Sequence, residues 1–189
     1  GYMFAVNAGF DKGEFFHRRF TGVIPGATYN FSAWIIDLTA SAPTNPNVSF
    51  TVYDHNTQLP LGTYNTGELT STVEPDSWQQ YGFSFVATAS DIDLVIGNNG
   101  LGGNGNDLAI DDISFAMIPP TIPITTVADS GCGTSGSITI TSPLGASYEY
   151  TLDTTVVNSW QSSPVFNNLN AATYTVFARF VGTVGCIAS

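Results

Sequence analysis

Positively charged residues are the scarcest part of this sequence. The 189 residues contain 4 Lys and Arg against 15 Asp and Glu, which gives a formal net charge of −11. Charged residues of both signs make up only 10% of the chain, whereas soluble domains carry roughly 25%. Four cations cannot neutralise a row of phosphates or hold an acidic bilayer surface. We therefore expect neither a nucleic-acid partner nor an acidic-membrane partner.

Long apolar runs are missing as well. No stretch approaches 18 uninterrupted apolar residues, which is about the length that crosses a bilayer as a helix, so no membrane insertion is expected. The first residues lack the basic and apolar regions of a secretory signal peptide. If the protein is exported, we expect its signal to lie outside these 189 residues.

Groups that catalyse reactions are few. The chain has 2 His and 2 Cys, and no serine stands in the Gly-x-Ser-x-Gly pattern of a nucleophile elbow. A pair of carboxylates for glycoside hydrolysis would need one acid with a raised pKa in a cleft, which spacing alone cannot demonstrate. We expect no enzymatic activity.

Strand patterns are abundant. Apolar and polar residues alternate in several segments separated by turns rich in Gly, Pro and Asn, and 43% hydrophobic residues are enough for a packed core. Helical periodicity appears nowhere at useful length. The pattern predicts an all-β protein built as a sandwich or barrel, with strands at residues 29–36, 48–53, 81–85 and 174–180.

A proline-rich segment divides the chain. Three prolines at positions 119, 120 and 123 favour a stiff, extended connection. Twelve of the 15 acidic residues precede it, so the acidity belongs to the first part. We expect one domain at residues 1–118, a linker at 119–123 and a smaller domain at 124–189.

The two cysteines, Cys132 and Cys186, lie near the two ends of the smaller domain. In an oxidising compartment they predict a disulfide, which would stabilise a small domain by roughly 3–5 kcal/mol in the chain-entropy model. The alternative is two buried free thiols.

Three motifs in the first part resemble a known family. They are YMFAVN at residues 2–7, PGATYNFSAW at 25–34 and NDLAIDDISF at 106–115, with a further strand at 78–85. In this order they resemble the galactose-binding-like jelly rolls of carbohydrate-binding modules and bacterial surface proteins. The resemblance implies a jelly-roll β-sandwich.

The second part resembles the immunoglobulin-like repeats of adhesins and gliding-motility proteins of the Bacteroidetes. The matching segments are 132–140, 148–153, 166–169, 172–176 and 185–186. The resemblance implies a small immunoglobulin-like β-sandwich after the jelly roll. Both families usually have one more strand, before residue 1 and after Cys186 respectively. We expect a neighbouring domain or another subunit to supply these strands by β-augmentation.

The jelly-roll resemblance also implies a structural calcium ion with a ligand from the last strand, Asp111 or Asp112. Strict alternation sends these two side chains to opposite faces, so only one can be an inward ligand. The loop at residues 7–14 offers the oxygens of Asn7, Asp11 and Glu14. The alternative is that the two aspartates are only hydrogen-bonded at a sheet edge.

Trp34 is the main candidate for ligand binding. By alternation it shares a face with Ser32 and Ile36, while Phe31, Ala33 and Ile35 form the core face. An exposed Trp can stack on a sugar ring, or it can form a second core layer under a loop. Further candidates for the ligand groove are Arg18, which shares a face with Phe16 and Phe20, together with Tyr53 and His55 at the end of the next strand. The alternative for Arg18 is an ion pair with an acidic residue.

A glycine- and asparagine-rich tract at residues 97–107 contains a formal G-x-G-x-x-G at positions 100, 102 and 105. A dinucleotide site would need a helix after it, and here a strand follows. The tract predicts a hairpin loop, or else a rim that contacts ligand through Asn98, Asn99 and Asn104.

Together with the composition, the two resemblances imply a non-catalytic segment of a secreted bacterial cell-surface adhesin or filament protein. The jelly roll would bind glycan or act as a calcium-stabilised spacer, and the repeat would form a stalk. The alternatives are a carbohydrate-binding module attached to a secreted glycoside hydrolase and a structural subunit that polymerises by strand donation.

Overall fold

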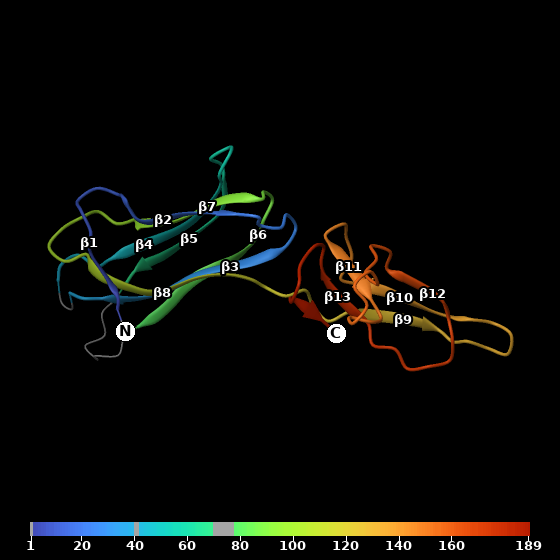
Figure 1. Ribbon diagram of the computed structural model, residues 1–189. Helices are drawn as coiled ribbons and strands as arrows, with labels where there is room; N and C mark the ends of the chain where they lie inside the picture. The colour runs from blue at the N-terminus through green and yellow to red at the C-terminus, as the bar shows by residue number, and fades with distance from the viewer. Residues whose placement is uncertain (1, 40–41, 70–77) are drawn as a thin grey trace. The chain divides into compact units, whose positions relative to one another are not determined.

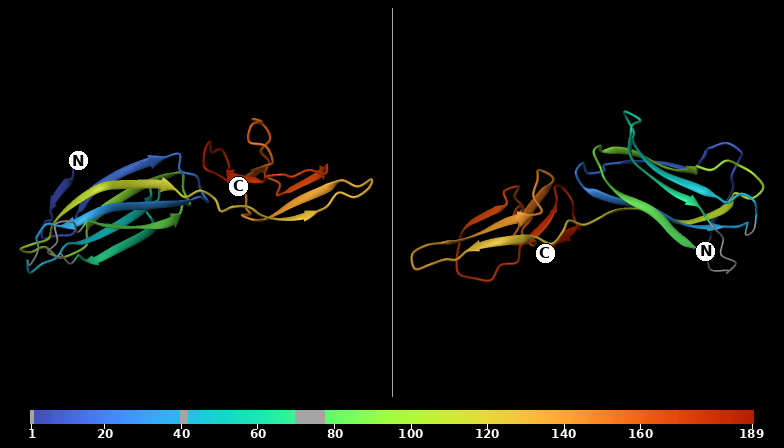
Figure 2. Two further views of the ribbon diagram at one scale, coloured as in Figure 1. Left: turned by 90° about the horizontal axis from the view of Figure 1, so that it is seen from below. Right: turned by 180° about the vertical axis from the view of Figure 1, so that it is seen from behind.

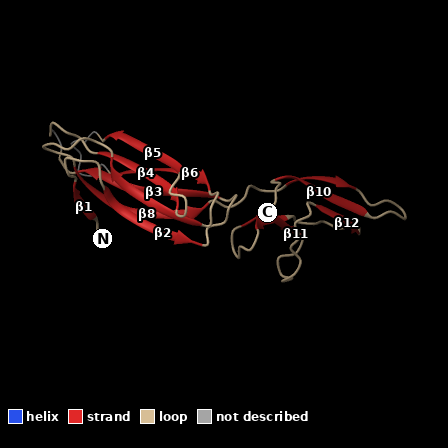
Figure 3. Cartoon of the chain, turned by 90° about the horizontal axis from the view of Figure 1, so that it is seen from above, coloured by secondary structure: helices blue, strands red, loops and turns tan. Residues whose placement is uncertain are grey.

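The computed structural model describes residues 2–39, 42–69 and 78–189. The chain forms two compact units, Gly1–Met117 and Ile118–Ser189. Residues 118–123, which contain the three prolines, belong to no strand. Within the described ranges every regular element is a β-strand (Figure 3), so the predicted all-β class is confirmed. The same ranges hold no helix long and apolar enough to cross a membrane.

The first unit is a jelly roll of eight antiparallel strands. They form two four-stranded sheets with the orders β1-β8-β3-β6 and β2-β7-β4-β5, which lie as two layers in Figures 1 and 2. Two packed sheets of this kind form the double Greek-key sandwich. The strands are β1 (Phe4–Asn7), β2 (Glu14–Thr21), β3 (Thr28–Asp37), β4 (Asn47–Asp54), β5 (Pro60–Glu68), β6 (Gln79–Val86), β7 (Asp91–Asn98) and β8 (Asp107–Met117).

The core of the jelly roll lies between its two sheets. As the alternation predicted, Phe31, Ala33 and Ile35 of β3 are buried, with at most 1% of each exposed. The ring of Phe31 meets Phe50 of β4 edge to face at a centroid distance of 5.3 Å. Because β3 and β4 belong to different sheets, this contact fixes which side of each sheet faces inward.

The last strand of the jelly roll contains a β-bulge. On β8, Ser114 pairs with Ser32, but the next paired position places Asp111 opposite Trp34. Asp112 within the bulge has a left-handed φ of 48°. A bulge adds one residue to one strand, so the alternation of inward and outward residues on β8 changes at this point.

The second unit is a smaller sandwich of two three-stranded sheets, with the orders β12-β10-β9 and β11-β13-β14. Its core contains Ile140, Tyr150 and Ala178 from both sheets. The predicted strand at 174–180 forms only over its last four residues. The strands are β9 (Ile124–Ala128), β10 (Gly136–Ser142), β11 (Tyr148–Thr151), β12 (Val165–Leu169), β13 (Phe177–Phe180) and β14 (Ile187–Ala188).

The predicted disulfide is absent, and both thiols are free, Cys132 exposed and Cys186 half-buried. Cys132 lies in the β9–β10 connection, at the end of the unit where Gly136 pairs with Leu169. Cys186 directly precedes β14, and Figure 1 shows the C-terminus at the opposite end of this unit from the β9–β10 connection. A disulfide requires Cα atoms within about 7 Å, and strand direction keeps these two apart. Cys132 and Cys186 lie near the two ends of the domain in sequence, but the fold does not bring these ends together.

Candidate functional site

The predicted ligand residues fall on different surfaces of the jelly roll. Trp34 alternates with the buried Phe31, Ala33 and Ile35 and therefore points away from the core on the sheet that contains β3. Tyr53 follows the buried Val52 on β4 and points away from the core on the opposite sheet. The two aromatic side chains therefore line opposite outer faces and cannot form one groove.

Trp34 stands in a set of polar side chains, of which only Asp111 is charged, here called the Trp34 face. The indole is 38% exposed, so its ring is available to solvent. Trp34 pairs with the exposed Gln80 on the neighbouring strand β6 and with Asp111 on the other neighbouring strand, β8. The other members of the Trp34 face are Asn30, Ser32 and Ser84.

Hydrogen bonds fix these polar groups in place. Gln80 Nε2 and Asn30 Nδ2 both donate to Ser32 Oγ, each at 3.3 Å, and Ser84 Oγ donates to Asn30 Oδ1 at 3.4 Å. An amide has two donor hydrogens and two acceptor lone pairs, so these bonds leave groups on Gln80 and Ser84 free to bind a ligand. The face combines a flat apolar ring with ordered neutral donors and acceptors.

Sequence reasoning found Trp34 and Ser32 but missed Gln80 and Ser84. Alternation along residues 79–86 could have placed these two on one side of a strand. It could not show that this strand pairs with β3, which brings Gln80 opposite Trp34 and Ser84 opposite Asn30.

Tyr53 and His55 belong to a second polar cluster, around the carboxylate of Asp93. Only 4% of Asp93 is exposed. His55 Nδ1 donates to its Oδ2 at 2.8 Å, and Gln58 Nε2 donates to the same oxygen at 3.2 Å. His17 Nε2 lies 3.6 Å from Oδ1. Tyr53 pairs with Asp93 across β4 and β7.

In this cluster, the hydrogen bonds and the charge of His55 together affect the pKa of Asp93 more than burial does. Burial alone would raise the pKa of Asp93, but the hydrogen bonds from His55, Gln58 and His17 and the charge of His55 together hold that pKa below its ordinary value. The side chains around Asp93 thus bind one another, which favours a structural role.

Arg18 also makes an internal contact. It lies on β2, at the edge of the sheet that carries Tyr53, and its guanidinium lies 5.1 Å from the centroid of the Phe20 ring. Arg18 therefore lies beside an aromatic residue, as predicted, and makes a cation–π contact with it. This contact is on a different sheet from Trp34.

The asparagines of the glycine-rich tract hold loops together. Asn98 is 4% exposed, and its Nδ2 donates to the carbonyls of Gly9 and Asp11, each at 3.3 Å. Its Oδ1 accepts from Gly100 N at 3.1 Å. Asn99 accepts from Lys12 Nζ and donates to Asn47 Oδ1, both at 3.1 Å. Asn104 is exposed.

The residues predicted to bind calcium do not meet around one ion. Asn7 pairs with Asp107, whereas Asp111 lies beyond Ile110, which pairs with Phe4 at the other end of β1. Glu14 is on the other sheet, 3.2 Å from His17 Nδ1, and Asp11 uses its carbonyl to bind Asn98. The bulge places Asp111 beside Trp34 on the outward side, where its Oδ1 accepts from Asp112 N at 2.8 Å. Across residues 2–39, 42–69 and 78–189, no group of three His, Cys, Asp or Glu residues is placed to hold a metal ion.

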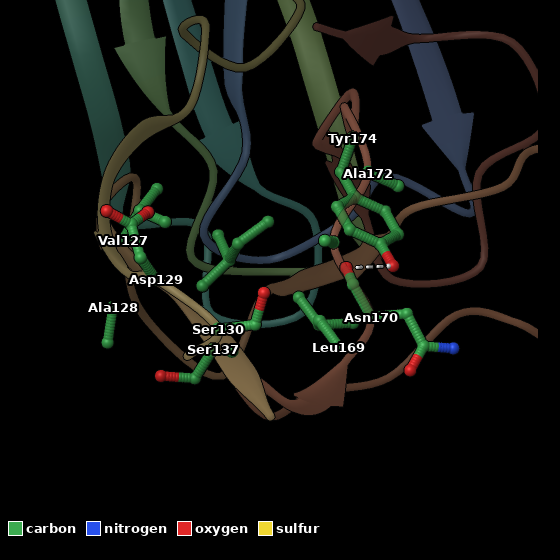
Figure 4. A pocket seen from close by; sticks show the side chains of 12 residues that line it. Val127, Ala128, Asp129, Ser130, Ser137, Leu169, Asn170, Ala172 and Tyr174 are labelled. Atoms are coloured by element: carbon green, nitrogen blue, oxygen red, sulfur yellow. Dashed lines mark hydrogen bonds between the residues drawn. The ribbon is translucent and has the colours of Figure 1, made fainter. Parts of the chain in front are cut away.

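The second unit contains a hollow of about 500 Å³ between the end of β9 and residues 169–174. Figure 4 shows Val127, Leu169 and Tyr174 among its walls. The hydroxyl of Tyr174 donates to the carbonyl of Asn170 at 3.1 Å. The polar side chains of Asp129, Ser130, Ser137 and Asn170 also line this hollow, but its aromatic residue, Tyr174, is half-buried, whereas Trp34 is exposed.

Comparisons with known proteins give likenesses among solved structures but none among family models or curated sequences. No protein-family model and no curated protein sequence matches the chain. Among solved structures, the chain is similar to one described as "EclA C-terminal domain; sugar-binding protein", with 22% sequence identity and a TM-score of 0.46. The match covers 61% of this chain and 79% of that one.

Proposed function

We propose that the jelly roll is a glycan-binding module whose ligand stacks on Trp34. The observation that carries this proposal is an exposed indole on the outer face of a sheet, between the amide of Gln80 and the carboxylate of Asp111. Binding sites generally combine an apolar surface with a few well-placed polar groups. A pyranose presents C–H groups on its face and hydroxyls around its edge, so it can contact the ring and these polar groups together.

The charge of the chain favours neutral glycans. The net charge is −11, and the Trp34 face contains no cation. Anionic polysaccharides would meet repulsion from the protein as a whole. We therefore expect neutral hexose polymers to bind, and sulfated or uronic-acid polymers to bind more weakly.

A glycan array and affinity electrophoresis in neutral polysaccharide gels test this proposal. Trp34→Ala should abolish retardation in any gel that slows the wild-type chain, and Gln80→Ala should weaken it. Phe10→Ala is the matched control, because Phe10 is also an exposed aromatic residue, 77% exposed, and lies outside the Trp34 face. Binding by Trp34→Ala equal to that of the wild type, or no binding by the wild type to any neutral glycan, would contradict the proposal.

The setting we propose is an exported, non-catalytic protein of the bacterial cell surface, an adhesin or filament protein in which the second unit acts as a stalk. The two sandwich units and the proline-containing segment between them support an arrangement of serial modules. The alternative setting is a module attached to a secreted glycoside hydrolase. The sequence of the parent gene distinguishes the two, because the first predicts further repeats and the second a catalytic domain.

A second candidate function is assembly by strand addition, and one observation favours it. Among the described residues, β8 pairs with β1 only from Asp107 to Ile110, while its pairing with β3 continues to Met117. An edge with free backbone groups can accept a strand from another chain. Sedimentation velocity tests this function, since assembly predicts species larger than 20.0 kDa at micromolar concentration and a purely monomeric profile argues against it.

A further inference from the structure

Four buried polar side-chain atoms lack a hydrogen-bond partner in the described part of the chain, and they belong to only three residues. They are Asp37 Oδ2, Asn106 Oδ1, Asn106 Nδ2 and Asp107 Oδ1. Asn106 is completely buried, with 0% of its surface exposed. Buried polar groups are almost always hydrogen-bonded in native proteins, so a cluster of exceptions indicates a missing partner.

The three residues are neighbours in the fold. Asp37, the last residue of β3, pairs with Leu108 of β8, and the next residue, Leu38, donates its backbone N–H to Asp107 O at 2.9 Å. Asn106 directly precedes β8. The three residues thus lie where the end of β3 meets the beginning of β8.

No cationic side chain of this protein is available to neutralise the two carboxylates. The chain has only four Lys and Arg residues, and each contacts another group. Lys12 donates to Asn99, Arg18 lies over Phe20, Arg19 pairs with Asp91, and Arg179 pairs with Glu149. Both histidines contact Asp93. Asp37 and Asp107 are half-buried, and charges that are removed from water are normally paired or coordinate a metal.

The backbone around these residues is already fixed. Thr39 donates to Asp37 Oδ1 through its backbone N at 2.8 Å and through Oγ1 at 3.1 Å, which holds the carboxylate and leaves Oδ2 free. Asn106 has a left-handed φ of 64°. Its N–H donates to Thr44 O at 3.0 Å, and its carbonyl accepts from Ala8 N at 3.4 Å. The donor atoms are thus presented by an ordered backbone.

We propose that Asp37, Asn106 and Asp107 bind one calcium ion. Their free ligand atoms are oxygens, which calcium prefers, and calcium completes its 6–8 ligands with backbone carbonyls and water. Water bound to the ion can accept from Asn106 Nδ2, and the double charge balances the two carboxylates. This site uses none of Asp111, Asn7, Asp11 and Glu14, and it lies apart from the Trp34 face.

The bound ion would hold three segments together. Asn106 is hydrogen-bonded to Ala8 after β1 and to Thr44 after β3, and Asp107 is hydrogen-bonded to Leu38. An ion on Asp37, Asn106 and Asp107 would therefore connect the end of β1, the loop after β3 and the glycine-rich tract before β8.

Isothermal titration with calcium chloride and thermal melts of the full chain, first stripped with chelator, test the proposal. The wild type should bind one calcium ion, and its melting temperature should rise by several degrees with saturating calcium. Asp37→Asn and Asp107→Asn should each lower calcium affinity at least tenfold and remove most of the rise in melting temperature. Asp111→Asn is the matched control and should keep the calcium affinity and the calcium-dependent rise in melting temperature of the wild type.

The Asn106→Asp variant distinguishes between two occupants of this site, a calcium ion and water. It keeps an oxygen ligand and adds a negative charge, so it should bind calcium more tightly while the calcium-free protein melts at a lower temperature. Wild-type protein with no calcium binding and an unchanged melting temperature would overturn the proposal. Loss of binding in Asp111→Asn with full binding in Asp37→Asn would overturn it as well. Circular dichroism of each variant shows that it is folded before titration.

Discussion

The guanidinium of Arg179 lies 3.9 Å from the centroid of the Trp160 ring. Arg179 also donates through Nε to Glu149 Oε1 at 2.7 Å. Both charged side chains are largely enclosed, with 17% and 16% exposed. One cation thus joins β13, β11 and the segment before β12, and it stabilises a unit whose core is small and whose cysteines are free.

Arg179→Ala should destabilise the second unit by about 2 kcal/mol, because it removes a cation–π contact and leaves Glu149 without its partner. Arg179→Lys keeps the charge but loses the flat stacking surface and should cost about half as much. Urea denaturation followed by Trp fluorescence measures both. Arg19→Ala is the control, since Arg19 pairs with Asp91 at 3.5 Å and is 49% exposed, and it should change stability by less than about 0.5 kcal/mol. Equal effects of Arg179→Ala and Arg19→Ala would contradict the assigned role.

Asp93 should make the first unit sensitive to acid. Its pKa in the folded protein is lower than the ordinary value of 3.8, so its contribution to stability is complete above that value. The contribution is lost as the pH falls through the lowered pKa of the folded state. Equilibrium unfolding between pH 6 and pH 2 measures this dependence. Asp93→Asn should be less stable at pH 6 and show a flatter dependence below about pH 4, and an unchanged slope in this variant would remove Asp93 as the cause.

Asn98→Ala should loosen the loops at one end of the jelly roll. The substitution leaves the carbonyls of Gly9 and Asp11 and the N–H of Gly100 without their partner, which predicts a loss of about 2–3 kcal/mol. Limited proteolysis should cut near residues 9–13 faster than in the wild type. The exposed Asn104 of the same tract provides the control, because Asn104→Ala should leave both stability and cleavage rate unchanged.

Gly82→Ala should disturb the Trp34 face, because Gly82 of β6 pairs with Ser32 of β3. A Cβ at this position would lie against the carbonyl oxygen of Phe31 and 2.6 Å from Ser32 Cα, so β3 and β6 would have to separate. We expect a loss of about 2 kcal/mol or more and weaker glycan binding. Gly9→Ala is the control, since nothing lies within 4 Å of a Cβ there. Wild-type stability of Gly82→Ala in thermal melts would show that the sheet accommodates the methyl group.

The alternation of residues predicted much of the fold. It located β3 and β4 within two residues of their ends and separated the buried Phe31, Ala33 and Ile35 from the outward Trp34. It could not assign strands to sheets, because period 2 is the same in both sheets of a sandwich. For this reason Trp34 and Tyr53 were expected in one groove, although β3 and β4 lie in opposite layers.

The predicted calcium ligands depended on strict alternation along residues 109–114. The bulge at Asp112 breaks that alternation and places Asp111 beside Trp34. The hydrogen-bonding state of Asp37 and Asn106 has no signal in the sequence, because it depends on what the folded loops leave unpaired. The cysteine prediction failed for a related reason, since spacing along the chain does not give the direction of a strand.

The pairing of β1 with β8 determines how the jelly roll would respond to mechanical tension. Phe4 pairs with Ile110, and β8 continues past Ile110 to Met117, so the start of β1 and the end of β8 leave the sheet toward the same side. A force that pulls these two points apart acts on the residue pairs between β1 and β8 one after another, beginning with the pair at Phe4. Strands that leave toward opposite sides would have to slide past each other and break all pairs at once. Under tension the four-residue strand β1 is therefore the part of the jelly roll that detaches first.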